Sequence, residues 1–246
     1  MSQFAIAEAF VGDACAAKTQ CALYQAMMAC CASMGINYFA LLHHVDFARD
    51  AGTAIRLHSY PADWQVWFDE RGLGQSDPVH RASHAISIGF RWSAVPQLIK
   101  LTANDREILA TAARFGIGEG FTVPANVPGE VHASCSFAME PGQPFPEEFH
   151  FVAQLVGGFA FEAARRLSRG PHLELPTLTD RQRDCVLWAA RGKTDWEISQ
   201  ILGVSHETVI GHLKQARERY GVSKRALLAV RALFDGQISF SDVFKH

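Results

Sequence analysis

A helix stop and a helix start lie side by side near the C-terminus, in the segment WEISQILGVSHETVIGHLKQ at 196–215. Gly203 suits the left-handed conformation that ends many helices, and Ser205 is a favoured N-cap for the next helix. Apolar residues recur at helical spacing on both sides of this joint. Two helices joined by so short a turn are typical of a helix-turn-helix motif.

The residues around this joint predict a small all-helical domain. Thr179 and Thr194 each stand three residues before a Gln or a Glu, which is the spacing of a capping box. Gly192 fits the end of the helix that lies between these two caps. The apolar periodicity predicts four helices, at 180–191, 195–202, 206–219 and 223–235.

The helix expected at 206–219 has two different faces. One face is apolar and should be buried; it consists of Val209, Leu213, Ala216 and Tyr220. Its expected packing partners are apolar residues of the preceding helix, namely Ile198, Ile201 and Leu202.

The opposite face carries Gly211, where glycine costs roughly 1 kcal/mol relative to alanine, with the apolar Ile210 beside it. Both residues are explained if this face enters a DNA major groove. There, glycine permits a close backbone approach and an aliphatic side chain contacts a thymine methyl. Lys214 and Arg217 would reach phosphates or guanine edges, and the helix N-terminus at Ser205 can bind a phosphate. A helical bundle with an ordinary solvated face has the same spacing, so the pattern alone leaves both interpretations open.

Charge is divided unevenly along the chain. From Thr177 to the end there are 11 Lys and Arg against 8 Asp and Glu, whereas the rest of the chain has 12 against 17. The positive balance of the C-terminal part favours contact with nucleic acid, although differences of this size are common between domains.

The segment 178–233 closely resembles the C-terminal DNA-binding domain of LuxR-type transcription regulators. Matching elements include Gly192-Lys193-Thr194, Val204-Ser205 and Tyr220-Gly221-Val222. The chain departs from the family at Gln182, where Glu is usual, and at Ile210-Gly211, where a more polar pair is common. The expected DNA-binding residues are Lys193, Thr194, Ser205, His206, Thr208, Ile210, Gly211, Lys214, Gln215 and Arg217.

The N-terminal two thirds of the chain mix predicted helices with predicted strands. Helical spacing covers about 4–34, 60–72, 77–89, 102–116 and 146–167, while two strands are expected within 35–60 and a hairpin within 118–140. We therefore expect an α+β chain, in which an N-terminal α/β/α sandwich is joined to the small all-α domain. The expected boundaries are 1–167 for the ligand-binding and dimerisation domain, 168–176 for a linker and 177–246 for the DNA-binding domain.

An aromatic-rich stretch indicates what the first domain binds. YPADW at 60–64 is followed by Trp67-Phe68, by Asp77-Pro78 and by Trp92. This order resembles the acyl-homoserine-lactone-binding domain of LuxR-family quorum-sensing regulators, and the resemblance continues through 120–124 and 134–137. The sequence lacks the acidic cluster after an early strand that a phosphoacceptor receiver domain would need.

The resemblance implies a role for each polar residue, and the chemistry of a lactone amide agrees with these roles. Asp77 would accept the amide N–H, and Trp92 would donate its indole N–H to the lactone carbonyl. Tyr60 and Ser136 would donate to the amide-side carbonyl, and Trp64 would form an apolar wall. The full expected ligand set is Tyr60, Trp64, Phe68, Asp77, Val79, Trp92, Ile117 and Ser136. No cofactor is expected.

Each of these residues also has a purely structural interpretation. The aromatic residues can be ordinary core residues, Asp77 can be a turn residue or a helix cap, and Ser136 can be a small strand residue. Two positions depart from common family members: Phe68 replaces a frequent tyrosine, and Val79 replaces a hydroxyl found in some members. Fewer hydroxyls favour an acyl group without a 3-oxo function, or an aryl or branched one.

The resemblance and an apolar face make the helix at 146–167 the expected dimer contact. Two DNA-binding domains would then span half-sites about one helical turn apart, so the operator should be an imperfect palindrome. The rival interpretation within regulators is an orphan that answers a non-lactone signal or binds DNA without ligand.

Other functions are less well supported by the sequence. Ser134, Cys135 and Ser136 lack a GxSxG motif, so we do not expect an enzyme. His80 and His84 stand four residues apart without a carboxylate partner, and no metal site is expected. The six cysteines form no CxxC pair and fit small buried residues. No signal peptide or membrane span is evident, so we expect a cytoplasmic protein.

Overall fold

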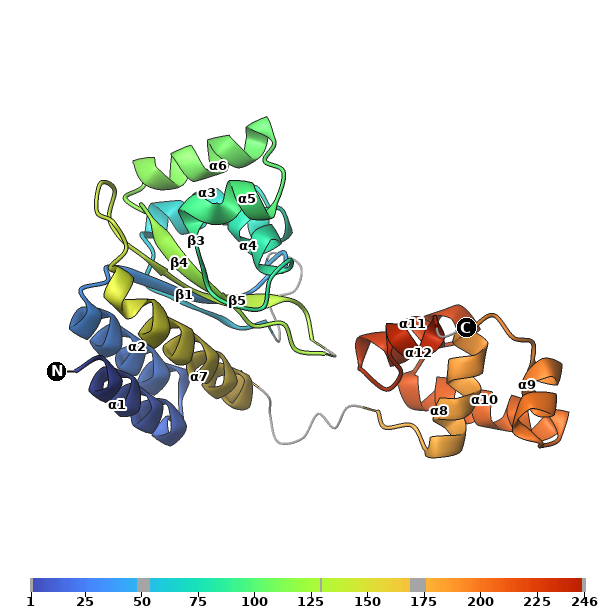
Figure 1. Cartoon of the computed structure of the whole chain (residues 1–246). Coiled ribbons are helices and arrows are strands. Elements are labelled where there is room, and N and C mark those ends of the chain that lie inside the picture. The colour runs from blue at the N-terminus through green and yellow to red at the C-terminus, as the bar shows by residue number, and fades with distance from the viewer. Residues whose placement is uncertain (1, 48–53, 129, 169–175, 245–246) are drawn as a thin grey trace. The chain divides into compact units, whose positions relative to one another are not determined.

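The computed structural model describes residues 2–47, 54–128, 130–168 and 176–244. The chain divides into two compact units, 1–126 with 131–171 and 127–130 with 172–246 (Figure 1). Most of the predicted linker at 168–176 lies outside the described residues.

The N-terminal unit is built on a five-stranded antiparallel sheet with the strand order β2-β1-β5-β4-β3. The strands are β1 (Tyr38–His43), β2 (Arg56–His58), β3 (Phe90–Arg91), β4 (Gly120–Pro124) and β5 (Ala133–Ala138). The register pairs Ala40 with both His58 and Ser136, and pairs Ser136 with Thr122. These four residues therefore form one row across a single face of the sheet.

Helices cover both faces of the sheet (Figure 1). On one face lie α1 (Gln3–Ala16), α2 (Gln20–Met34) and α7 (His150–Ser168). On the other lie α3 (Ala62–Glu70), α4 (Pro78–Ser83), α5 (Val95–Leu98) and α6 (Ala103–Arg114), with the short 3-10 turns Leu73–Gln75 and Trp92–Ala94 between them. A further 3-10 turn, Glu147–Phe149, precedes α7. The predicted α/β/α layering is confirmed.

Some boundaries differ from the sequence predictions. The helical region at about 4–34 is two helices, because Thr19 accepts a hydrogen bond from the backbone N–H of Ala22 and starts α2 as a new helix. The helix expected at 77–89 ends at Ser83. The following residues include Ile86, Ile88 and Gly89, which have low helix propensity. The short elements β3 and α5 were not predicted, since they are too short to show a period.

The C-terminal unit is entirely helical, as predicted. Its helices are α8 (Asp180–Ala190), α9 (Asp195–Leu202), α10 (His206–Tyr220), α11 (Arg225–Phe234) and the unpredicted short α12 (Phe240–Val243). Both predicted capping boxes, at Thr179 and Thr194, are present. Gly203 ends α9 at φ +65°, and the Ser205 hydroxyl accepts the backbone N–H of Thr208 at 3.1 Å to start α10. The stop and start seen in the sequence are thus a turn between two capped helices.

The core of this unit confirms the predicted buried face of α10 and corrects one partner. Val209, Leu213, Ala216 and Tyr220 are all buried. Ile198 is buried and Leu202 packs against the same core, but Ile201 is 43% exposed, so its predicted burial is wrong. At about 100° per residue, the buried stripe through Ile198 and Leu202 leaves Ile201 at its edge. Among the described residues, no helix is both long and apolar enough to cross a membrane.

Candidate functional site

A cavity lies in the N-terminal unit between the sheet and helices α3, α4 and α6. Water-sized spheres can occupy about 60 Å³ of it, and the space between its atoms, part of which is open to solvent, totals about 680 Å³. All eight residues of the expected ligand set line it: Tyr60, Trp64, Phe68, Asp77, Val79, Trp92, Ile117 and Ser136. The fold therefore brings together residues that are up to 76 positions apart in the sequence.

Asp77 is a helix cap, which is one of its two interpretations from the sequence, and it also lines the cavity. It is the N-cap of α4, and its Oδ1 accepts the backbone N–H groups of Val79 at 2.8 Å and His80 at 3.0 Å. The same buried side chain lines the cavity. Since both cap bonds use Oδ1, the second carboxylate oxygen is available for a further hydrogen bond.

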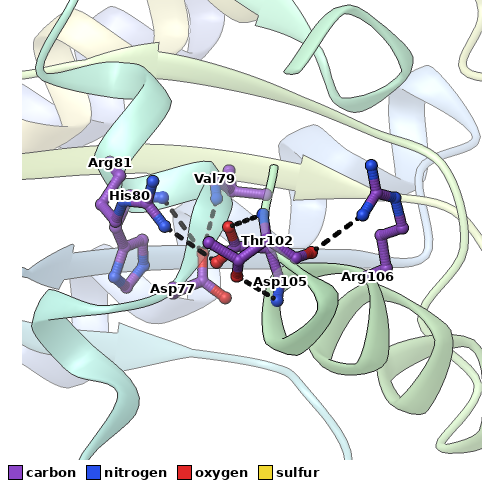
Figure 2. A network of polar contacts seen from close by, with 7 residues as sticks. All are labelled: Asp77, Val79, His80, Arg81, Thr102, Asp105 and Arg106. Atoms are coloured by element: carbon purple, nitrogen blue, oxygen red, sulfur yellow. Dashed lines mark hydrogen bonds and ion pairs between the residues drawn. The ribbon is translucent and has the colours of Figure 1, made fainter. Parts of the chain in front are cut away.

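A second carboxylate fixes α4 against α6, as Figure 2 shows. Arg81 donates to Asp105 at 2.8 Å, and Asp105 forms a reciprocal capping box with Thr102 at the start of α6. Burial alone would raise the pKa of Asp105, but the hydrogen bonds from Thr102 and Arg81 outweigh it and the pKa is lowered. This ionised network holds the helix that carries Asp77.

Trp92 begins a chain of hydrogen bonds along the polar row of the sheet. Its indole N–H donates to Thr122 Oγ1 at 2.8 Å, and Thr122 Oγ1 lies 2.8 Å from Ser136 Oγ. A Cβ at Gly120 would stand 2.5 Å from the Trp92 ring, so glycine at this position lets the indole lie against β4. Thr122 was not among the predicted site residues. Only the strand register, which the sequence does not state, places it between Trp92 and Ser136.

Aromatic side chains form the apolar wall of the cavity. The rings of Trp64 and Trp67 stack with centroids 5.2 Å apart, and Trp64 lies 5.6 Å from Phe68. Tyr60 stands at the edge of this group, 6.1 Å from Tyr38. Burial, followed by the charge of Asp77, raises the pKa of Tyr60 above its usual value, so its phenol stays protonated and can donate a hydrogen bond.

Four histidines cluster beside the cavity, of which His80 lines it. His44 Nδ1 lies 2.8 Å from His84 Nε2, and the His44 ring stacks on His80 at 3.9 Å. The His84 ring in turn stacks on His132 at 4.1 Å. Burial and the neighbouring imidazoles lower the pKa of His84 to about 4 and place that of His44 well below its usual value. In the described part of the chain, no three His, Cys, Asp or Glu residues are arranged to hold a metal ion.

The cavity also contains polar residues that the sequence analysis did not predict. Arg56 and His58 reach it from β2, and Asp69 reaches it from α3. Arg56 and Asp69 form an ion pair at 2.7 Å. The sequence offers little indication that Arg56 and His58 share a face, because β2 is only three residues long and cannot show a clear alternation.

The predicted DNA-contacting face of α10 is largely exposed. His206, Thr208, Lys214 and Gln215 are exposed, and Ile210 is 43% exposed. Gln215 is not free, because its side-chain oxygen accepts a hydrogen bond from Gln182 at 3.2 Å. A Cβ added to Gly211 would meet nothing within 4 Å. Arg217 is half-buried.

Lys193 and Thr194 stand at the start of α9. Thr194 caps this helix, and Lys193 pairs with Glu197 at 3.1 Å. The backbone hydrogen bond from Thr194, together with Lys193, lowers the pKa of Glu197 to about 2. Arg225 of α11 reaches the same corner and pairs with Asp195. These two ion pairs fix the turn before α9.

Comparison with known families covers both units. Residues 19–167 match the model of the autoinducer binding domain, and residues 176–232 match that of bacterial regulatory proteins of the luxR family. The chain belongs to the LuxR family of transcription regulators. It is an autoinducer-binding, DNA-binding regulator of the quorum-sensing type, and the family consists of transcription factors rather than enzymes.

Individual relatives agree with this assignment. The chain is 32% identical over 181 residues to a putative helix-turn-helix regulator of Sinorhizobium fredii; the match covers 73% of this chain and 56% of that protein. It is 30% identical to the quorum sensing-dependent regulator RpaR of Rhodopseudomonas palustris, with 74% of each chain covered. The crystal structure of Escherichia coli SdiA shares the fold at 20% identity and a TM-score of 0.71, covering 96% of this chain and 98% of that one.

Proposed function

We propose that the N-terminal unit senses an N-acyl or N-aryl homoserine lactone, and that the C-terminal unit binds promoter DNA in response. The observation that carries this proposal is the cavity itself. An acceptor, Asp77, and three donors, Tyr60, Trp92 and Ser136, meet there among apolar walls. A lactone amide presents one N–H and two carbonyls on an otherwise apolar molecule, which is the pattern that this cavity complements.

The hydrogen-bond chain of the polar row is compatible with donation by Ser136. Thr122 Oγ1 accepts the indole N–H of Trp92 and shares a second hydrogen bond with Ser136 Oγ, in which either hydroxyl can be the donor. When Thr122 is the donor, the proton of Ser136 is left for a ligand carbonyl. To bind the lactone carbonyl, the Trp92 indole N–H would either leave Thr122 Oγ1 or form a hydrogen bond to both acceptors at once.

The acyl group is proposed to lack a 3-oxo function. Phe68 and Val79 are both buried in the cavity wall, and neither can hydrogen-bond a second oxygen. A lactone panel in which 3-oxo, long-chain members bind best would contradict this part of the proposal.

The test of ligand identity is mass spectrometry of small molecules released from protein expressed with and without candidate lactones. A lactone released in stoichiometric amount supports the sensor proposal and identifies the acyl group. Folded protein that retains no lactone from any culture would instead favour the orphan interpretation, in which another signal or none is required.

We expect Lys214→Ala and Arg217→Ala each to weaken operator binding by about tenfold and to reduce its salt dependence, since each removes a cation at the proposed DNA face. Neither residue lines the ligand cavity, so lactone binding should be unchanged. Fluorescence anisotropy at several salt concentrations measures both effects. Arg183→Ala is the control, because it removes a positive charge from an exposed position on α8 that is outside the proposed face. Unchanged DNA affinity in both variants would show that α10 is not the recognition helix.

The proposed regulator acts in the cytoplasm as a homodimer on a palindromic operator. An apolar stripe on α7 supports the dimer: Phe151, Leu155 and Phe159 are 84%, 47% and 44% exposed and lie four residues apart. Such a stripe is unusual on a surface that stays in water.

Phe151→Glu combined with Leu155→Glu is expected to produce monomers, because two charges would have to be buried in the dimer contact. The free energy of unfolding of the monomer should change little, since both side chains are exposed. Sedimentation velocity measures the mass, and Val66→Glu, at a 56% exposed position on α3, is the control. A double variant that still sediments as a dimer would place the contact elsewhere.

A further inference from the structure

His58 is one of the polar residues of the cavity that the lactone head group does not explain. It lies in β2, in the same row of the sheet as Ala40, Ser136 and Thr122. Two strand spacings separate it from Ser136, or about 10 Å. The only residue between them in this row is Ala40, whose small side chain leaves space over the sheet.

The Nδ1 atom of His58 is buried and has no hydrogen-bond partner. A buried polar atom without a partner is uncommon and costs stability, so it calls for an explanation. Burial, with Arg56 adding to it, lowers the pKa of His58 to about 4. The imidazole is therefore neutral at neutral pH, and depending on its tautomer Nδ1 either accepts or donates one hydrogen bond.

The charged residues around His58 are already paired. Arg56 lines the cavity beside it and is held by Asp69 at 2.7 Å. The lining residues Ala40, Leu42 and Phe47 offer no side-chain hydrogen bond. Gln65 donates to the backbone oxygen of Tyr60 at 3.0 Å, and the Tyr60 ring lies 6.0 Å from that of His58. A purely aliphatic tail at this end would cover Nδ1 and leave it unpaired. A ligand that carries a hydroxyl there would satisfy it.

We propose that the acyl group of the ligand carries a hydrogen-bonding group, of the hydroxyl type, at the end remote from the lactone, and that His58 Nδ1 binds it. This inference rests on the proposed function, since it assumes that the lactone head group lies at Asp77, Trp92 and Ser136. A separation of about 10 Å places the polar group well beyond the 3-oxo position. His58 would then select among lactones by the far end of the acyl group.

The test compares pairs of lactones that differ only at the chain end. Hexanoyl, octanoyl and decanoyl homoserine lactones with a terminal hydroxyl are each matched with the analogue that has a methyl in place of the hydroxyl. For the wild-type protein we expect the hydroxyl member of at least one pair to bind about tenfold more tightly. In His58→Phe this preference should disappear or reverse, whereas His58→Asn, which keeps a polar group, should retain part of it.

Isothermal titration calorimetry gives the affinities, and the wild-type preference alone decides the outcome if a variant fails to fold. Tighter binding of the methyl member in every pair would overturn the inference while leaving lactone sensing intact. A hydroxyl preference that persists in folded His58→Phe would also overturn it. Failure of every lactone to bind would refute the proposed function itself, and this inference with it.

Discussion

Replacing Asp77 with asparagine should lower lactone affinity by about 100-fold or more while leaving the N-terminal unit folded. The two oxygens of this carboxylate have separate tasks. Oδ1 accepts two backbone N–H groups at the start of α4, and an asparagine carbonyl can accept the same two bonds. In asparagine, an NH₂ group takes the place of the second carboxylate oxygen, Oδ2, so a charged acceptor is replaced by a donor. This donor would face the amide N–H of the ligand, so a favourable hydrogen bond becomes a contact between two donors.

The measurement for Asp77→Asn is lactone binding by calorimetry, together with the thermal midpoint of the protein without ligand. Asp105→Asn is the matched control, because Asp105 is also a buried carboxylate at a helix start but does not line the cavity. Asp105→Asn should lower the thermal midpoint, since it weakens the pair with Arg81. Because the Asp77 carboxylate itself is kept, lactone affinity should fall much less than in Asp77→Asn. If Asp77→Asn binds lactone as tightly as the wild type, then Asp77 is only a helix cap and the head group is recognised elsewhere.

How far the sequence predicts this molecule depends on whether the relevant interaction is local. The caps at Thr179, Thr194 and Ser205 were predictable because a cap joins residues three apart. The sequence could not show that Thr122 lies between Trp92 and Ser136, because strand register is set by the packing of the whole sheet. For the same reason, the sequence could not decide whether Asp77 is a helix cap or a residue of the ligand site. Its cap is a local interaction, whereas its exposure to the cavity depends on α4 being fixed to α6.

The same distinction applies to the residues that were misjudged or missed. Ile201 has the hydrophobicity of a core residue, but the helix turns it away from the stripe that α10 covers. His58 was overlooked because β2 is too short to show alternation, and its interest arises from an unpaired atom that only the packed cavity reveals. Gly211 was noticed because it breaks a local rule of helix propensity. The structure adds that nothing in the fold requires it, since an added Cβ would meet no atom within 4 Å.

Gly211→Ala should therefore stabilise the C-terminal unit and weaken its binding to DNA. Alanine in a helix is favoured over glycine by about 1 kcal/mol, which corresponds to a rise in thermal midpoint of about 4–8 °C for a domain of this size. If α10 lies in the major groove with its backbone close to the bases, the added methyl must push the helix away. We expect operator affinity to fall about tenfold or more, because several base and phosphate contacts depend on that approach.

Gly12→Ala is the control that separates the two effects. Gly12 is also a glycine inside a helix, α1, where an added Cβ meets nothing within 4 Å, but it belongs to the N-terminal unit. It should raise stability in the same way and leave DNA affinity unchanged. A stabilised Gly211→Ala protein that binds its operator as tightly as the wild type would show that the α10 backbone does not approach DNA at this point. Another contact of the same face would then have to explain the glycine at position 211. A gain in stability together with a loss of DNA affinity would instead show that α10 is less stable than it could be because its backbone must approach the groove.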